Sequence, residues 1–143
     1  MAVTTLKAII DRFQTILEGS NVNLKPTREP FTHDRQPNTL LTDSYRVADA
    51  GLQNTRSITN EKEARIDRIQ VFVARKLAFD GQTAAETMHT TLNTIERYIV
   101  ADGPANSYHA SLSGRQVTPS ASKDFLIGSV IISVDYDYNV ATS

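Results

Sequence analysis

Oxygen-bearing side chains alternate near the end of the sequence, in the run Asp135-Tyr136-Asp137-Tyr138-Asn139. Carboxylate and amide oxygens at this spacing open a calcium-binding loop, in which a glycine follows and a bidentate glutamate closes the loop. Here Val140 takes the place of the glycine, and no glutamate follows. Because the alternation is typical of a strand, we interpret the run as part of a strand and not as a calcium site.

The other residue types that could do chemistry are dispersed. His33, His89 and His109 are not spaced to share a metal from one helical turn. Ser113 precedes Gly114 but lacks the strand–turn–helix setting of a hydrolase nucleophile. The absence of cysteine excludes a disulfide framework, a thiolate metal site and a cysteine nucleophile. We therefore expect no enzyme activity, no metal and no cofactor, and a role in protein interaction.

These residues must be positioned by regular elements, and the clearest of these runs from Val130 to Val140. Its apolar face comprises Val130, Ile132, Val134, Tyr136, Tyr138 and Val140. The opposite face is polar except for Ile131. Since successive side chains of a strand point to opposite faces, we predict a strand with one buried face, which another layer must cover.

A helical pattern between Thr83 and Ala101 predicts the covering layer. Its apolar stripe follows the spacing i, i+4, i+7 and i+11, with Met88, Leu92, Ile95 and Ile99. Thr83 and Glu86 have the spacing of a capping box at the start. Asp102-Gly103-Pro104 then offers a glycine for a left-handed cap and a proline that cannot continue the helix.

Three further elements are predicted. Apolar residues at helical spacing predict a helix from Thr5 to Glu18, with Gly19 at its C-cap. Alternation predicts a strand from Ile69 to Phe79. Tyr108 to Val117 predicts another strand, with a bulge or bend at Gly114.

Together these elements predict an α+β fold, with a mostly antiparallel sheet of about four strands and two helices packed on one face. A length of 143 residues with 40% apolar content fits one domain over residues 1–143. Residues 20–64 form a connection, rich in polar residues and proline, that is too long for a compact domain. Short strand candidates lie around Leu40 to Leu41 and Tyr45 to Val47, so the connection could fold into a hairpin that leaves the body. We interpret it either as a flexible linker or as an extended arm that becomes ordered on a neighbouring subunit.

Single apolar side chains within this polar connection are candidates for a subunit or partner interface. They are Phe31, Leu40, Leu41 and Tyr45. Packing on their own subunit is an equally open interpretation.

The charge distribution argues against nucleic acid as a partner. Residues 21–65 contain seven basic and six acidic residues, a net of +1, and residues 81–143 contain three basic and six acidic, a net of −3. A nucleic-acid-binding arm would need an excess of basic residues to neutralise phosphates. No apolar run reaches the length of a membrane span, so we also expect no membrane partner.

The layout of these elements is informative as a whole. An N-terminal helix is followed by a strand from Arg68 to Phe79, an acid-ended helix from Thr83 to Asp102 and a final strand that begins Gly128-Ser129-Val130-Ile131-Ile132. This layout resembles the tail terminator (tail completion) proteins of long-tailed bacteriophages, over most of the chain but without a diagnostic motif. The resemblance implies a small α+β subunit that forms a six-fold ring on the finished tail tube, ends tube polymerisation and offers a docking surface for the head connector.

Partners and location are also implied by the resemblance. They are a homo-oligomer at the head-proximal end of the virion tail, assembled in the host cytoplasm, in contact with the tail tube protein and the head–tail connector protein. DNA would pass through the ring without specific binding. We hypothesise that Asp135 and Asp137, or acids of the second helix such as Glu96, face the lumen and form an acidic wall.

Two alternative functions are weighed against the tail terminator. A neck or head-completion protein of the same assembly would bind the portal-side connector instead. A stand-alone ligand-binding or regulatory α+β domain would stay monomeric or dimeric and have a pocket lined by apolar residues.

Overall fold

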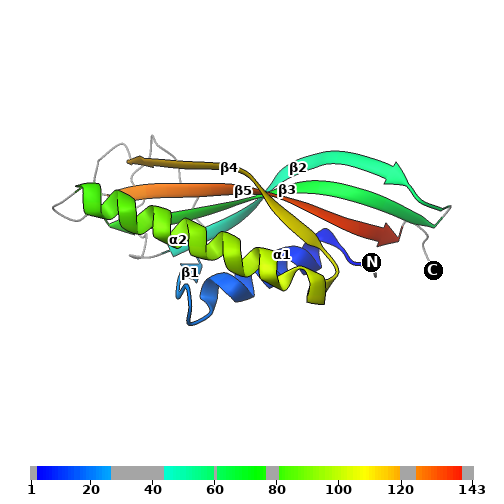
Figure 1. Ribbon diagram of the computed structural model, residues 1–143, viewed down its shortest axis with the longest axis horizontal. Helices are drawn as coiled ribbons and strands as arrows, with labels where there is room; N and C mark the ends of the chain where they lie inside the picture. Colours follow the sequence, from blue (N-terminus) through cyan, green and yellow to red (C-terminus); the bar gives the residue numbers. More distant parts are fainter. Residues whose placement is uncertain (1–2, 27–43, 60, 77–80, 120–124, 140–143) are drawn as a thin grey trace.

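The computed structural model describes residues 3–26, 44–59, 61–76, 81–119 and 125–139, which form two long helices, one short helix and a sheet (Figure 1). The helices are α1 (Leu6–Glu18), α2 (Gly81–Asp102) and the 3-10 helix η1 (Pro104–Asn106). The strands are β1 (Lys25–Pro26), β2 (Ser44–Ser57), β3 (Lys62–Lys76), β4 (His109–Pro119) and β5 (Phe125–Asn139).

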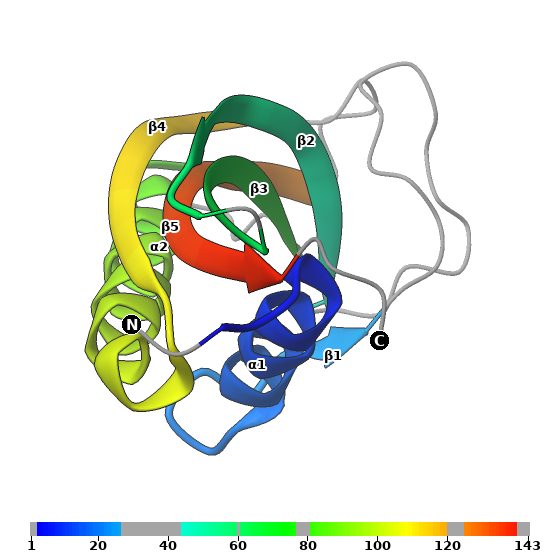
Figure 2. The same ribbon diagram turned by 90° about the vertical axis from the view of Figure 1, so that its right-hand side faces the viewer.

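The five strands form one sheet in the order β1-β2-β3-β5-β4. β2, β3, β5 and β4 are antiparallel to their neighbours, and β1 alone pairs in parallel, with the start of β2. α1 and α2 lie on the same side of this curled sheet (Figure 2). The predicted α+β class, with two helices on one face of a mostly antiparallel sheet, is confirmed, and the short β1 brings the sheet to five strands.

The last strand buries its predicted apolar face as far as Tyr136, whereas Tyr138 is half-buried and Val140 lies outside the described residues. Val130, Ile132, Val134 and Tyr136 are at most 2% exposed and face the helices. The four stripe residues of α2 are fully buried in the same core. Helix and strand approach so closely that a Cβ added at Gly128 would lie 2.6 Å from Sδ of Met88 on α2.

α1 is the second helix of this layer and buries Ile9, Phe13 and Leu17. Thr5 is its N-cap, with a hydroxyl that accepts a hydrogen bond from the N–H of Ala8. Gly19 occupies the C-cap position, as predicted, and donates its N–H to the carbonyl of Ile16. The ring of Phe13 lies 5.9 Å from the ring of Tyr108, which precedes β4, so α1 contacts the β4 end of the α2–β4 connection.

The two ends of α2 correct the prediction in detail. The helix begins at Gly81, before the capping box expected at Thr83. Gly103 is right-handed (φ −56°, ψ −53°), so the left-handed cap predicted there is wrong, and the left-handed residue is Ser107, at φ 67°. Glycine is needed at position 103 for space, because a Cβ would lie 2.5 Å from the backbone oxygen of Tyr108.

The connection predicted over residues 20–64 contains a long strand. β2 pairs with β3 along its whole length, so this part belongs to the sheet and forms a hairpin. The predicted element order lacked β1 and gave β2 only as a short strand candidate at Tyr45–Val47, which is the start of the 14-residue strand. The physical reason is that two register shifts, between Asp49 and Gly51 and between Leu52 and Asn54, interrupt the alternation that would identify a strand.

The two remaining strands follow the prediction more closely. β3 begins at Lys62, well before the expected Ile69, while Leu77 and Phe79 lie outside the described residues. β4 has a register shift between Leu112 and Gly114, which confirms the predicted bulge.

Candidate assembly surface

One end of the sheet projects beyond the helices (Figure 1). It comprises the tip of the β2–β3 hairpin and the end of β5, which pairs with the start of β3. The hydroxyl of Thr59 accepts hydrogen bonds from the N–H groups of Glu61 and Lys62, at 3.2 and 3.0 Å. Ile58, which is 47% exposed, donates its N–H to the carbonyl of Lys62 at 3.0 Å. An apolar side chain is thus displayed on a defined turn.

Polar contacts stabilise the base of this end on the helix-covered face of the sheet, where Tyr136 and Asp67 are still buried. The hydroxyl of Tyr136 donates to Oδ2 of Asp67 at 2.6 Å. Arg65 donates to Glu63 at 2.7 Å and stacks its guanidinium 3.8 Å from the ring centroid of Tyr138. Burial, together with the bond to Asp67, raises the pKa of Tyr136, so its hydroxyl stays a hydrogen-bond donor at neutral pH. These contacts join β3 to β5.

Asp135 and Asp137 lie on the other, helix-free face of the projecting end. Together with Asn54, Arg56 and Ile66 they line a hollow of about 370 Å³. Oδ2 of Asp137 lies 3.8 Å from Nζ of Lys62, in an ion pair. The backbone oxygen of Asp137 accepts a hydrogen bond from the N–H of Thr4 at 2.9 Å, which fastens the N-terminal segment to β5.

The charge of the helix-free face differs from the acidic wall that the sequence suggested. Cross-strand partners point to the same face, and the register places four basic side chains on the face of the two aspartates: Arg46, Arg56, Lys62 and Arg68. Glu96 lies on α2, in the helical layer, so the structure does not bring it together with Asp135 and Asp137. The charge count over residues 81–143 omitted β2 and β3, which supply these basic residues.

The sheet ends in two edge strands, β2 and β4. Among the described strands, β4 pairs only with β5, and β2 beyond Tyr45 pairs only with β3. Each edge strand carries an exposed leucine, Leu52 on β2 (53% exposed) and Leu112 on β4 (40% exposed). Within the described part of the chain, both edges are therefore available for pairing with another chain.

The candidate anchors of the connection are only partly described. Tyr45 is 2% exposed and packs in the core of its own subunit, so it is not an exposed interface residue. This is the other interpretation that the sequence left open, and it follows from the place of Tyr45 at the start of β2, opposite the buried Val73. Phe31, Leu40 and Leu41 lie outside the described residues.

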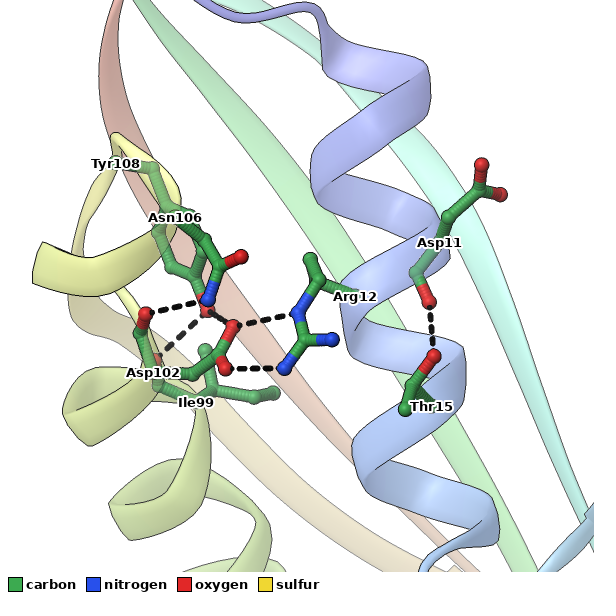
Figure 3. Close-up of polar contacts among 7 residues, drawn as sticks. All are labelled: Asp11, Arg12, Thr15, Ile99, Asp102, Asn106 and Tyr108. Atoms are coloured by element: carbon green, nitrogen blue, oxygen red, sulfur yellow. Dashed lines mark hydrogen bonds and ion pairs between the residues drawn. The ribbon is translucent and has the colours of Figure 1, made fainter. Parts of the chain in front are cut away.

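A polar cluster that sequence reasoning missed connects the helices (Figure 3). Arg12 on α1 makes a bidentate contact with Asp102 at the end of α2, with Nη2–Oδ1 at 2.6 Å and Nε–Oδ2 at 3.2 Å. The hydroxyl of Tyr108 lies 2.9 Å from the carbonyl of Ile99 and 3.0 Å from Oδ2 of Asp102, so its proton is donated to one of these oxygens at a time. Asn106 donates to the backbone oxygen of Asp102 at 3.1 Å.

This cluster has a structural explanation. Burial and the neighbouring carboxylate of Asp102 raise the pKa of Tyr108, so the phenol remains protonated and is no base. The hydrogen bond with Asp102 raises the pKa of Arg12, which stays charged. Every group faces a partner within the protein, and the cluster joins α1, α2 and the start of β4. The helical pattern does not identify this contact, because an ion pair between residues 90 positions apart leaves no local signal in the sequence.

The remaining chemical candidates do not converge. His89 on α2 and His109 on β4 are exposed, and His33 lies outside the described residues. Within the described part of the chain, no three His, Asp or Glu residues are placed to hold a metal ion. A second hollow, of about 600 Å³, lies beside α2 and is lined by Thr94, Glu96, Arg97, Tyr98, Val100 and Ala101. None of the described helices is both long and apolar enough to span a membrane.

Comparisons with known proteins do not assign a family. No family model matches the chain, and the search of curated proteins found no match. The argument for function therefore depends on the layout of the chain and on the surfaces described above.

Proposed function

We propose that the protein is a phage tail terminator, a structural virion protein that forms a ring on the tail tube and ends its polymerisation. One observation carries the proposal: a mostly antiparallel sheet that extends past its helices at one end, with two edge strands, β2 and β4, that have no further strand beside them over most of their length among the described residues. Such a shape offers separate surfaces for neighbouring copies and for a tubular partner. A terminator must present different surfaces at its two ends, so that no further tube subunit can add.

The projecting end is the proposed contact with the tail tube. Ile58 is exposed, and its backbone N–H donates to the carbonyl of Lys62, so the side chain is presented next to a hydrogen-bonded pair of strand ends. An exposed apolar side chain at such a position is a candidate anchor that fills a pocket of the partner. The opposite end of the ring would then face the head–tail connector protein.

The helix-free face is the proposed wall of the lumen, with Asp135 and Asp137 on it and Glu96 in the outer, helical layer. On this face Lys62 offsets the charge of Asp137, so the wall is mixed in charge. In this proposal DNA passes without specific binding, because among the described residues both α1 and α2 lie on the other side of the sheet, so neither helix can enter a groove from this face. The protein would lie at the head-proximal end of the tail after assembly in the host cytoplasm.

Electron microscopy of purified tail tubes with added protein tests the proposal. Wild-type protein is expected to form a ring at one tube end and to stop elongation when free tube subunits are supplied. Ile58→Asp is expected to abolish capping at unchanged thermal stability. Tyr98→Asp is the matched control, because it changes an equally exposed apolar residue on α2, away from the projecting end, and should still cap.

Other outcomes decide between the alternatives. Binding to connector complexes but not to tube ends would favour a neck or head-completion protein. A protein that remains monomeric and binds neither would favour a stand-alone domain. Wild-type protein that leaves tube elongation unchanged overturns the terminator proposal.

A further inference from the structure

The two edge strands are similar in length and run in opposite directions, so they are suited to pair with each other across two copies. β4 has 11 residues, and β2 has 14, of which the first two pair with β1. β2, β3, β5 and β4 alternate in direction, so an even number of strands leaves the two edges running oppositely. When two copies lie side by side in the same orientation, β4 of one therefore meets β2 of the next in antiparallel register. This pairing continues the hydrogen-bond pattern of the sheet.

The exposed leucines of the two edges are also matched. Leu112 pairs with Ile132, and Leu52 pairs with Asp67, whose partner on β5 is Val134. Both leucines therefore lie on the helix-covered side of the sheet. A row here is a set of paired residues across the strands: Leu112 is in the row of Ile132 and Leu52 is in the row of Val134, two residues further along β5. Side chains in adjacent rows of neighbouring strands are diagonal neighbours, within reach of long apolar groups.

α2 extends the apolar surface beside β4. The guanidinium of Arg115 on β4 donates to the side-chain oxygen of Asn93, which fixes that side of α2 next to the edge strand. Val100, which is seven residues further along and on the same side of the helix, is 40% exposed. Leu112 and Val100 thus form an apolar border along the β4 edge.

We infer that β4 of one copy pairs with β2 of a second copy, head to tail, with Leu52 of one chain packed near Leu112 and Val100 of the other. This inference deepens the proposed function, because a head-to-tail contact that closes on itself makes a ring. A two-fold pairing of β4 with β4 would bury Leu112 but leave Leu52 exposed. Head-to-tail pairing covers both exposed leucines, and this favours it.

Cysteine cross-linking tests the inference directly, because the chain has no cysteine of its own. Ser111 on β4 and Asn54 on β2 lie on the helix-free side, in rows next to each other, so neither substitution alters the leucines. A mixture of Ser111→Cys and Asn54→Cys proteins, treated with a short bismaleimide linker, is expected to give covalent dimers. A chain with both substitutions is expected to give a ladder that ends at the ring. Lys7→Cys, on the exposed side of α1, is the control partner and should not cross-link with either.

The outcomes separate this inference from the proposed function. Cross-linking is done on the free protein at its highest soluble concentration and again with tail tubes. Self-linking of Ser111→Cys, or no cross-link in either arm, overturns head-to-tail edge pairing. Cross-linked rings that do not bind tubes support the edge pairing and refute the terminator function. Capped tubes without the cross-link support the function and refute the edge pairing.

Discussion

The close approach of α2 to β5 at Gly128 gives the sharpest test of the packing. A Cβ at position 128 would lie 2.6 Å from Sδ and 2.8 Å from Cγ of Met88, and 3.1 Å from Cδ1 of Leu92. Met88 and Leu92 are fully buried, so the contacted atoms have no solvent to move into. Gly128→Ala must therefore push α2 away from the sheet or force Met88 out of its rotamer.

The expected cost follows from two opposing effects. Adding a methyl group to a filled core costs about 1–3 kcal/mol, whereas alanine restricts the unfolded chain and returns about 0.4–1 kcal/mol. The net effect is a loss of about 1–2 kcal/mol in the free energy of unfolding. For a chain of this length, the loss lowers Tm by about 3–8 °C.

Urea unfolding, followed by circular dichroism, measures this change, and Gly114→Ala is the matched control. At Gly114 the nearest atom to an added Cβ is Cδ1 of Ile131, at 3.9 Å, so this variant should be as stable as wild type or slightly more stable. In a Met88→Ala background the clash is removed, and the cost of Gly128→Ala should largely disappear. Equal stability of the two single glycine variants would refute the packing argument.

Three further predictions concern the polar contacts. Tyr108→Phe leaves the carbonyl of Ile99 or the carboxylate of Asp102 without its buried donor, and should lower the free energy of unfolding in urea by about 1–2 kcal/mol. Arg12→Ala should cost about 1 kcal/mol in low salt and less in high salt, because its side chain is 40% exposed; urea titrations at two salt concentrations measure this. Burial raises the pKa of Tyr45, Tyr108 and Tyr136 above the ordinary 10.0, so the protonated form is favoured in the folded state. Their contribution to stability is present below pH 10 and is lost as pH rises above it, which a pH series of thermal melts would show.

The elements that the sequence predicted correctly are those with an uninterrupted period. β5 alternates without a break because one face packs on helices along most of its length, and α2 keeps one stripe in the core. Only the start of β2, at Tyr45–Val47, was a strand candidate, because bulges shift its register twice and its outer half is exposed on both faces, so burial imposes no pattern there. The outer half of β2 is a strand because it pairs with β3, and this pairing leaves no pattern in the local sequence.

The site was harder to predict than the fold because its charge and its apolar surface come from segments that are far apart in the sequence. Asp135 and Asp137 were correctly placed on one face of a strand, but the basic residues beside them come from β2 and β3. Likewise, Leu52 and Leu112 are unremarkable in the sequence and become related only through the strand order. An exposed leucine alone is ordinary, whereas two on matching rows of opposite edges form a pattern.

Open edge strands can aggregate into fibres, and the bulges in these strands counteract this tendency. Head-to-tail edge pairing has no built-in end and produces fibres unless curvature closes the assembly. Bulges bend a strand and increase its twist, and all three register shifts in this sheet lie on the edge strands, two on β2 and one on β4. Under the inferred pairing, each copy is therefore rotated relative to the next, and every β4–β2 contact adds the same rotation. That rotation makes a closed ring, rather than an endless sheet, the natural product of the pairing.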